Sequence, residues 1–209
     1  MPQSDLVFSK AAVTRISHDL AGVISAVSNS LALLDELGGA DQETLKLAMD
    51  NADILMKRLR FFRAVFGNEG PLSDMDTARR ILEEYLSTLE NRAVHYECIW
   101  KTDRELPIFV FRLILLGGMI VADTLPRGGK ITVYAEAGSH CVRFEAEGRT
   151  AVDPLLVSIA EGTYGDVPTP KIVPAVFLQK CLSEQGWSMS VSEQDEKVVI
   201  RLGEKERQG

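Results

Sequence analysis

Between residues 11 and 37, apolar side chains recur at steps of three and four, and this pattern constrains the fold more than any other part of the chain. The stripe consists of Val13, Ile16, Leu20, Val23, Ile24, Val27, Leu31 and Leu34. Such a period predicts an amphipathic helix with one continuous apolar stripe, running from about Ser9 to Leu37. Gly38 and Gly39 follow it, and glycine commonly ends a helix.

A second apolar stripe predicts another long helix between Asp41, a suitable N-terminal cap, and the turn at residues 67–71. This stripe consists of Leu45, Ala48, Met49, Ala52, Leu55, Met56, Leu59, Phe62 and Phe66. Two amphipathic helices joined by a short turn predict an antiparallel hairpin, which cannot bury both stripes by itself. Pairing two hairpins across a two-fold axis gives a four-helix bundle, so we expect a homodimer.

His18 points roughly opposite the apolar stripe of the first helix. The other residues of this outer surface, which we call the His18 face, are Ala11, Thr14, Ala21, Gly22, Ser25 and Asn29. Gly22 costs about 0.5–1 kcal/mol relative to alanine inside a helix, which suggests that close approach matters there. We expect an imidazole that a second protein can reach, flanked by Arg15 and Asp19; the alternative is an ordinary solvated histidine.

The composition of the 209-residue chain is that of an ordinary globular protein, with 45% hydrophobic and 25% charged residues. A net charge of −7 argues against a nucleic-acid partner, because phosphate backbones are bound by clustered Lys and Arg. Three widely spaced cysteines fit no zinc pattern and imply no disulfide framework, which favours a cytoplasmic location. The apolar run Leu106–Ala122 contains Arg112 and two glycines, so we expect a buried helix and no membrane span.

The character of the chain changes after residue 70, and we expect two domains, 1–70 for the hairpin and 71–209 for the remainder. The expected helices of the second domain are Thr77–Asn91, Ile108–Thr124, Asp153–Glu161 and Pro174–Gln185. The expected strands are Val94–Lys101, Lys130–Glu136, Cys141–Ala146, Trp187–Glu193 and Lys197–Leu202, with a turn at Gly138-Ser139. This order predicts a mixed sheet with helices on one face, an α/β sandwich, so the fold class of the whole chain is α+β.

The segment Ile16-Ser17-His18-Asp19-Leu20-Ala21-Gly22 resembles the phosphoacceptor motif of bacterial sensor histidine kinases. In that family a histidine followed by an acidic residue and leucine lies on the first helix of a dimerising hairpin. The second domain is similar to the ATPase domain that follows the hairpin. Asp123–Val133 is similar to the segment that closes the family's asparagine-bearing helix, and Pro174–Trp187 is similar to its last helix and turn.

The chain departs from the kinase family at the positions that bind nucleotide. The two asparagines that help hold Mg²⁺ and nucleotide correspond to Leu116 and Ile120, and the aspartate that reads adenine corresponds to Ala146. Pro174 stands where a glycine-rich lid would cradle phosphates. The resemblance thus implies no ATP, no cofactor and no metal on this chain. It identifies the chain as a member of the ChpT-type histidine phosphotransferases, which join such a hairpin to a degenerate ATPase-like domain.

By this resemblance, His18 takes a phosphoryl group from the aspartate of one response-regulator receiver domain and passes it to another in a two-component phosphorelay. The expected partners are receiver domains, including that of a hybrid histidine kinase, which dock on the His18 face and bring their own Mg²⁺. Asp19 is the candidate for orienting the imidazole or accepting its proton. Arg15 is the candidate for neutralising phosphoryl charge.

Two alternatives stay open from the sequence: a divergent histidine kinase and a non-enzymatic dimeric scaffold that docks receivers. Leu116, Ile120 and Ala146 argue against the kinase, and a nucleotide-binding titration would test it. The presence of His18 followed by Asp19 argues against the scaffold.

Overall fold

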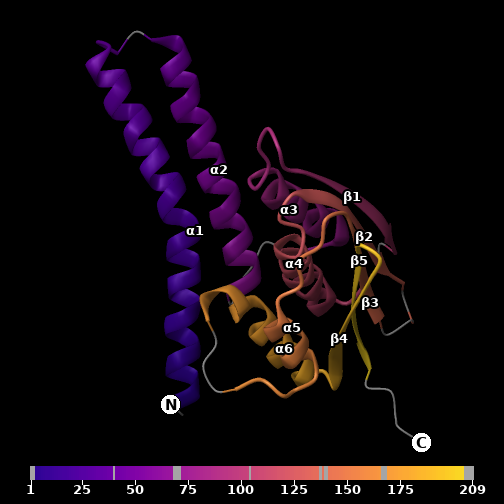
Figure 1. Cartoon of the computed structure of the whole chain (residues 1–209). Helices are drawn as coiled ribbons and strands as arrows, with labels where there is room; N and C mark the ends of the chain where they lie inside the picture. The colour runs from indigo at the N-terminus through magenta and orange to yellow at the C-terminus, as the bar shows by residue number, and fades with distance from the viewer. Residues whose placement is uncertain are drawn as a thin grey trace, which may run out of the picture.

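α1 (Gln3–Glu36) and α2 (Gln42–Phe66) form a long antiparallel hairpin, which packs on the helical side of a five-stranded sheet (Figure 1). The computed structural model describes residues 3–39, 41–67, 72–103, 105–136, 138, 141–165 and 169–204. The other elements are α3 (Met75–Ser87), β1 (His95–Thr102), α4 (Ile108–Asp123), β2 (Gly128–Ala135), β3 (Cys141–Glu147), α5 (Pro154–Ala160), the short 3₁₀ helix η1 (Pro170–Ile172), α6 (Val173–Glu184), β4 (Trp187–Gln194) and β5 (Lys197–Glu204). The predicted mixed α+β class is confirmed.

The first helix is longer at its start than the sequence pattern predicts. α1 begins at Gln3 rather than near Ser9. Phe8 stacks on Phe177 of α6, with ring centroids 6.0 Å apart, so the first turns of α1 rest against the second half of the chain. This contact lies outside the apolar stripe and stabilises turns that a local pattern does not reveal.

The turn between α1 and α2 follows the predicted signals. Gly38 and Gly39 both have positive φ, a backbone conformation that glycine adopts without steric cost, and they end α1. The side chain of Asp41 accepts a hydrogen bond of 2.7 Å from the backbone N–H of Thr44 and caps α2. The predicted hairpin is therefore confirmed at its turn.

The sheet has the strand order β1-β2-β3-β5-β4. β1 and β2 are parallel, with Cys98 opposite Ile131, and each of the other neighbouring pairs is antiparallel. In β3 the side chains of Val142, Phe144 and Ala146 are buried toward the helices, whereas those between them are partly exposed. Helices thus cover one face of the sheet, as predicted.

α4 lies at the centre of the core. Every residue from Val110 to Ala122 is buried except Arg112, which confirms the predicted buried helix. Arg112 reaches the end of the hairpin and donates a hydrogen bond of 3.0 Å to the backbone oxygen of Gly67. Within the described ranges, no helix combines the length and the apolar character that a membrane span requires.

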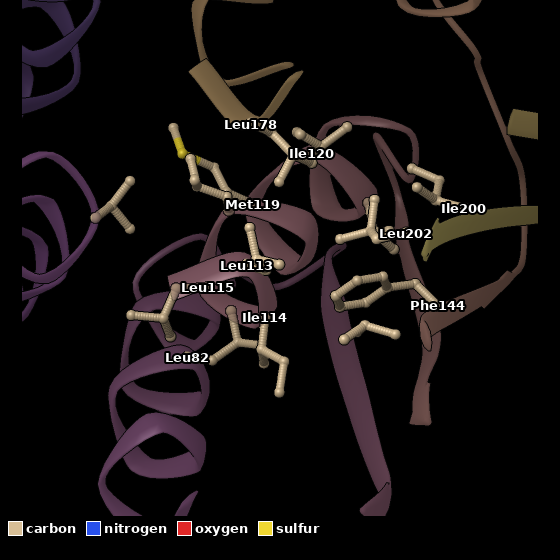
Figure 2. Packing of buried hydrophobic residues seen from close by; sticks show 14 of the residues in the cluster. Leu82, Leu113, Ile114, Leu115, Met119, Ile120, Phe144, Leu178, Ile200 and Leu202 are labelled. Atoms are coloured by element: carbon tan, nitrogen blue, oxygen red, sulfur yellow. The ribbon is translucent and has the colours of Figure 1, made fainter. Parts of the chain in front are cut away.

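Two glycines let α4 approach its neighbours closely. A Cβ atom on Gly117 would lie 2.3 Å from the ring of Phe144 in β3, and one on Gly118 would lie 2.6 Å from the side chain of Leu82 in α3. Figure 2 shows Phe144 directed at α4 from the sheet and Leu82 directed at it from α3. The sheet, α3 and α4 therefore form one tightly packed core.

The end of the hairpin belongs to the same core. Phe61 in α2 stacks on Tyr85 in α3, with ring centroids 3.8 Å apart, and Phe62, Ala64 and Val65 are also buried. The base of α2 is thereby fixed against the second half of the chain. The predicted boundary between residues 70 and 71, and Ser139 of the predicted β2–β3 turn, lie outside the described residues.

Candidate functional site

His18 lies near the middle of α1 with 86% of its side chain exposed. Ser17, Ala21, Gly22 and Ser25 around it are also exposed, and their side chains are too small to cover an imidazole. A Cβ atom on Gly22 would meet no atom within 4 Å, so packing inside the chain does not require glycine there. The structure thus leaves His18 on an open helix face.

Asp19 binds the imidazole on one side and a cation on the other. Its Oδ1 lies 3.4 Å from His18 Nδ1, and its Oδ2 accepts a hydrogen bond of 2.7 Å from Arg15 Nε. An ionised carboxylate only accepts hydrogen bonds, so this contact favours the tautomer in which Nδ1 carries the ring proton. Nε2 then keeps its lone pair and is available as a nucleophile.

Arg15 is turned toward the second half of the chain, and only 13% of its side chain is exposed. Besides Asp19, its guanidinium contacts Asp123 at the end of α4, with Nη2 lying 3.3 Å from both carboxylate oxygens. Nη1 also lies 3.5 Å from the backbone oxygen of Lys171. The sequence suggested that Arg15 neutralises phosphoryl charge, but in the structure two carboxylates of this chain already occupy its guanidinium.

Both members of the ion pair between Arg15 and Asp123 have shifted pKa values. Burial works to lower the pKa of Arg15, but Asp123 and Asp19 raise it above its ordinary value, so the guanidinium stays charged. Burial raises the pKa of Asp123, and Arg15 offsets only part of that effect. The ionised carboxyl of Asp123 is therefore held in an environment that disfavours its charge.

The His18 face is open along most of its predicted length. Its exposed members are Thr14, Ala21, Gly22, Ser25 and Asn29. Ala11 is only 8% exposed, so the prediction that it belongs to an open docking surface is wrong. Ala11 lies one turn after Phe8 and one turn before Arg15, on the side of α1 that packs against η1 and α6.

A hollow of about 400 Å³ lies beside His18, between α1, α2 and the end of α3. Its lining residues are His18, Asp19, Gly22, Val23, Ala26, Asn51, Ile54, Arg58 and Thr88. The open helix face therefore continues into a concave surface that includes residues of α2 and α3. The sequence pattern did not assign a role to Asn51, Arg58 or Thr88.

Arg58 is the functional candidate that the sequence pattern missed. It donates from Nη1 to the backbone oxygen of Asp19 at 2.7 Å, from Nε to Thr88 Oγ1 at 3.1 Å and from Nη2 to the backbone oxygen of Thr88 at 2.9 Å. A possible signal is that Asn51 and Arg58, both polar, recur seven residues apart on one face of α2. Which part of α1 they face depends on the register of the hairpin.

The three positions that the sequence resemblance matches to nucleotide-binding residues of kinases face the core. Leu116 and Ala146 are fully buried and Ile120 is nearly so, and none offers an oxygen ligand for Mg²⁺. The cavity that Ile120 and Asp123 help to line measures about 30 Å³, which is room for about one water molecule. Among the described residues, no group of three His, Cys, Asp or Glu side chains could hold a metal ion.

Comparisons with known proteins match both halves of the chain. The family model described as histidine phosphotransferase C-terminal domain matches residues 75–197. The protein phosphotransferase ChpT of Brucella abortus (strain 2308) is 29% identical over 195 residues, which cover 90% of this chain and 90% of that protein. A solved structure of a bacterial phosphotransferase has a TM-score of 0.80 and 27% identity, covering 97% of this chain and 98% of that one.

Proposed function

Because this chain belongs to the histidine phosphotransferase family, we propose that His18 is the residue that receives and passes on the phosphoryl group. The chain is a protein phosphotransferase of a two-component phosphorelay. The observation that carries the assignment of His18 is its exposed imidazole on a helix face of small side chains, with Asp19 against one ring nitrogen.

The proposed step uses a neutral imidazole. Nε2 of His18 attacks the phosphorus of an aspartyl phosphate in line with the leaving oxygen, an N–P bond forms, and the P–O bond to the donor carboxylate breaks. The bonding electrons leave with the donor aspartate, and the Nδ1 proton stays on the ring. Asp19 stabilises the positive charge of the phosphorylated ring, because its carboxylate lies against Nδ1. Attack by a second aspartate reverses these changes.

The partners that we propose are response-regulator receiver domains, including the receiver of a hybrid histidine kinase. A receiver would approach along Thr14, Ala21, Gly22, Ser25 and Asn29. The hollow beside His18 extends this surface onto α2 and α3 and favours a convex element of the partner at that place. We propose that the receiver supplies Mg²⁺, since phosphoryl transfer needs charge stabilisation and the imidazole itself supplies none.

We propose that the chain functions as a homodimer whose hairpins form a four-helix bundle. Large apolar side chains of both predicted stripes are exposed on the single chain: Val13, Ile24, Leu31, Leu45, Met49, Met56 and Leu59. Met49 is 64% exposed and Met56 is 56% exposed, seven residues apart on one face of α2. A second hairpin is a suitable cover for such a face, because its own stripe has the same length and character.

We propose that the chain uses no nucleotide and no metal of its own. The buried apolar side chains of Leu116, Ile120 and Ala146 support this, because they offer neither a ligand for Mg²⁺ nor an acceptor for adenine. Catalysis by a divergent kinase is not favoured for the same reason.

We also propose two domains, a phosphotransfer domain at 1–70 and a degenerate ATPase-like domain at 71–209. Free thiols at Cys98 and Cys181 favour a cytoplasmic location.

A transfer experiment tests the assignment of His18. Receiver domains are labelled on their aspartate with radioactive acetyl phosphate, mixed with the full chain, and the label on the chain is followed over time. We expect the wild-type chain to take up label that is labile to acid and stable to base, and His18→Gln to take up none. His95→Gln is the matched control, because His95 is also exposed but lies in β1. Label on His18→Gln equal to that on the wild type would rule out the assignment.

A further inference from the structure

Two arginines connect the helical turn of α1 that contains His18 to the second half of the chain. Arg15 joins the carboxylate of Asp19 to Asp123 at the end of α4. Arg58 joins the backbone oxygen of the same aspartate to Thr88 at the end of α3. Asp19 is thus held both by its side chain and by its backbone, and each tie ends in the domain that resembles an ATPase.

We propose that Asp123 and Arg15 are positioning residues for phosphotransfer. Asp123 holds the guanidinium of Arg15, Arg15 holds the carboxylate of Asp19, and Asp19 keeps the proton of the imidazole on Nδ1. The nucleophile Nε2 of His18 is thereby left unprotonated and directed away from the chain. This inference rests on the proposed role of His18 and gives the second domain a part in the reaction.

The location of Asp123 supports this role, because an ionised carboxylate at this position does not by itself stabilise the fold. Asp123 is the last residue of α4, where the negative end of the helix dipole repels a carboxylate. Its side chain is partly buried, and removal from water also disfavours the charge. Arg15 is the cation that compensates for both effects, so the carboxylate and the guanidinium depend on each other.

The geometry of a guanidinium suits this task better than that of an ammonium group. Arg15 presents Nε to Asp19 and Nη2 to Asp123, so one rigid planar group joins both carboxylates in a fixed relation. A lysine at position 15 would supply the charge but not two donors held at a fixed distance from each other. Arg15→Lys therefore separates charge from positioning.

Nitrogen NMR of the His18 ring in the full chain tests the positioning directly. We expect the Nδ1–H tautomer to dominate in the wild type, and Asp123→Asn and Arg15→Lys to lower the ratio of this tautomer to the Nε2–H form by about threefold or more. Glu84→Gln is the matched control, because it breaks the ion pair of Glu84 with Arg60, another contact of the hairpin with α3 that does not reach Asp19. An unchanged tautomer ratio in both Asp123→Asn and Arg15→Lys overturns the proposal, and so does an equal change in Glu84→Gln.

Transfer of label from a phosphorylated receiver separates this inference from the proposed function. We expect Asp123→Asn to accept label about tenfold more slowly than the wild type, and Glu84→Gln to accept it at the wild-type rate. If the wild type and Asp123→Asn accept label equally fast, the positioning role is wrong while the role of His18 stands. If His18→Gln accepts label as the wild type does, the proposed function fails instead.

Discussion

Arg15 in α1 and Asp123 at the end of α4 are 108 positions apart in the sequence, yet Nη2 of the arginine lies 3.3 Å from both carboxylate oxygens of the aspartate. The same guanidinium binds Asp19, the neighbour of His18, at 2.7 Å. The exposed imidazole is thus connected through the side chains of Asp19 and Arg15 to Asp123 in the second half of the chain. Under the positioning role proposed above, the second half of the chain acts on the histidine through this connection.

Substitution of Arg15 and substitution of Asp123 should have different effects on the free energy of unfolding. Arg15→Ala leaves the carboxylates of Asp19 and Asp123 close together without their cation, and we expect it to lower the free energy of unfolding by about 1–3 kcal/mol. Asp123→Asn removes a charge that its surroundings disfavour, and we expect a change of less than about 1 kcal/mol at neutral pH. Urea denaturation of both variants beside the wild type measures these differences.

The dependence of the free energy of unfolding on pH follows from the direction in which the pKa of Asp123 is shifted. Burial raises the pKa of the folded-state carboxyl above its unfolded-state value, so ionisation of Asp123 weakens the fold. The free energy of unfolding of the wild type relative to Asp123→Asn should therefore fall as the pH rises through the unfolded-state and then the folded-state pKa. A difference that instead grows in favour of the wild type over that range would contradict the shift.

The exposed apolar stripe of the hairpin is the proposed dimer surface. Charged side chains placed on this stripe should therefore prevent two chains from associating. We expect the double substitution Met49→Glu and Met56→Glu to convert a dimer into monomers, because burying two carboxylates in an apolar bundle costs several kcal/mol. Leu47→Glu is the matched control, since Leu47 is also exposed on α2 but points about 200° away from Met49. Analytical ultracentrifugation over a range of concentrations measures the association, and a monomeric wild type would refute the dimer.

Local periodicity was sufficient to predict the hairpin and the exposure of His18. The stripe of α1 and the small residues opposite it are set by neighbours three and four positions apart, so they are visible in the sequence. The burial of α4 was equally visible, because its apolar side chains occupy every face of the helix. These features depend on short-range chemistry alone.

The surroundings of His18 were less predictable. Ala11 is small and lies on the polar side of α1, which indicated an open surface, but it is buried on the side of α1 that packs against η1 and α6. Asp123 binds the guanidinium of Arg15 from the end of α4, and Arg58 reaches Asp19 from the other helix of the hairpin. Each of these contacts depends on how distant elements meet, which a period of 3.6 residues does not encode.

The N-terminal cap of α3 should contribute stability that is lost in acid. Hydrogen bonds from Ser73 and from the backbone N–H of Thr77 lower the pKa of Asp74 in the folded state. A lowered carboxyl pKa contributes stability above the unfolded-state value, and this contribution disappears as the pH falls through the folded-state value. We expect Asp74→Ala to lower the melting temperature by about 2–4 °C at neutral pH, with a smaller effect near pH 2.

Asp76→Ala is the control for that cap, because Asp76 lies in the same first turn of α3. The capping position is occupied by Asp74 alone, so only its loss removes the side-chain bond to Thr77. Thermal unfolding followed by circular dichroism compares the two variants with the wild type. Equal losses in Asp74→Ala and Asp76→Ala would show that the charge near the helix start matters and the cap does not.

Substitutions at Gly22 separate the effect of this glycine on the stability of α1 from its effect on access to His18. A Cβ atom there meets nothing within 4 Å, so we expect Gly22→Ala to stabilise α1 by about 0.5–1 kcal/mol. Gly22→Leu should also fold, since the position is exposed, but its side chain would stand one turn from the imidazole of His18. We expect it to slow phosphoryl transfer from a receiver at least about tenfold, because the phosphorus must come within bonding reach of Nε2.

Ala32→Leu is the matched control for this obstruction. Ala32 is also exposed on α1 but lies four turns from His18, toward the turn of the hairpin. If access to His18 is what Gly22 provides, Ala32→Leu should transfer at the wild-type rate and Gly22→Leu should not, although both fold. Wild-type transfer by Gly22→Leu would contradict the need for access at this position, both along the open helix face and in the hollow that Gly22 also lines. The docking surface would then have to be redrawn without Gly22.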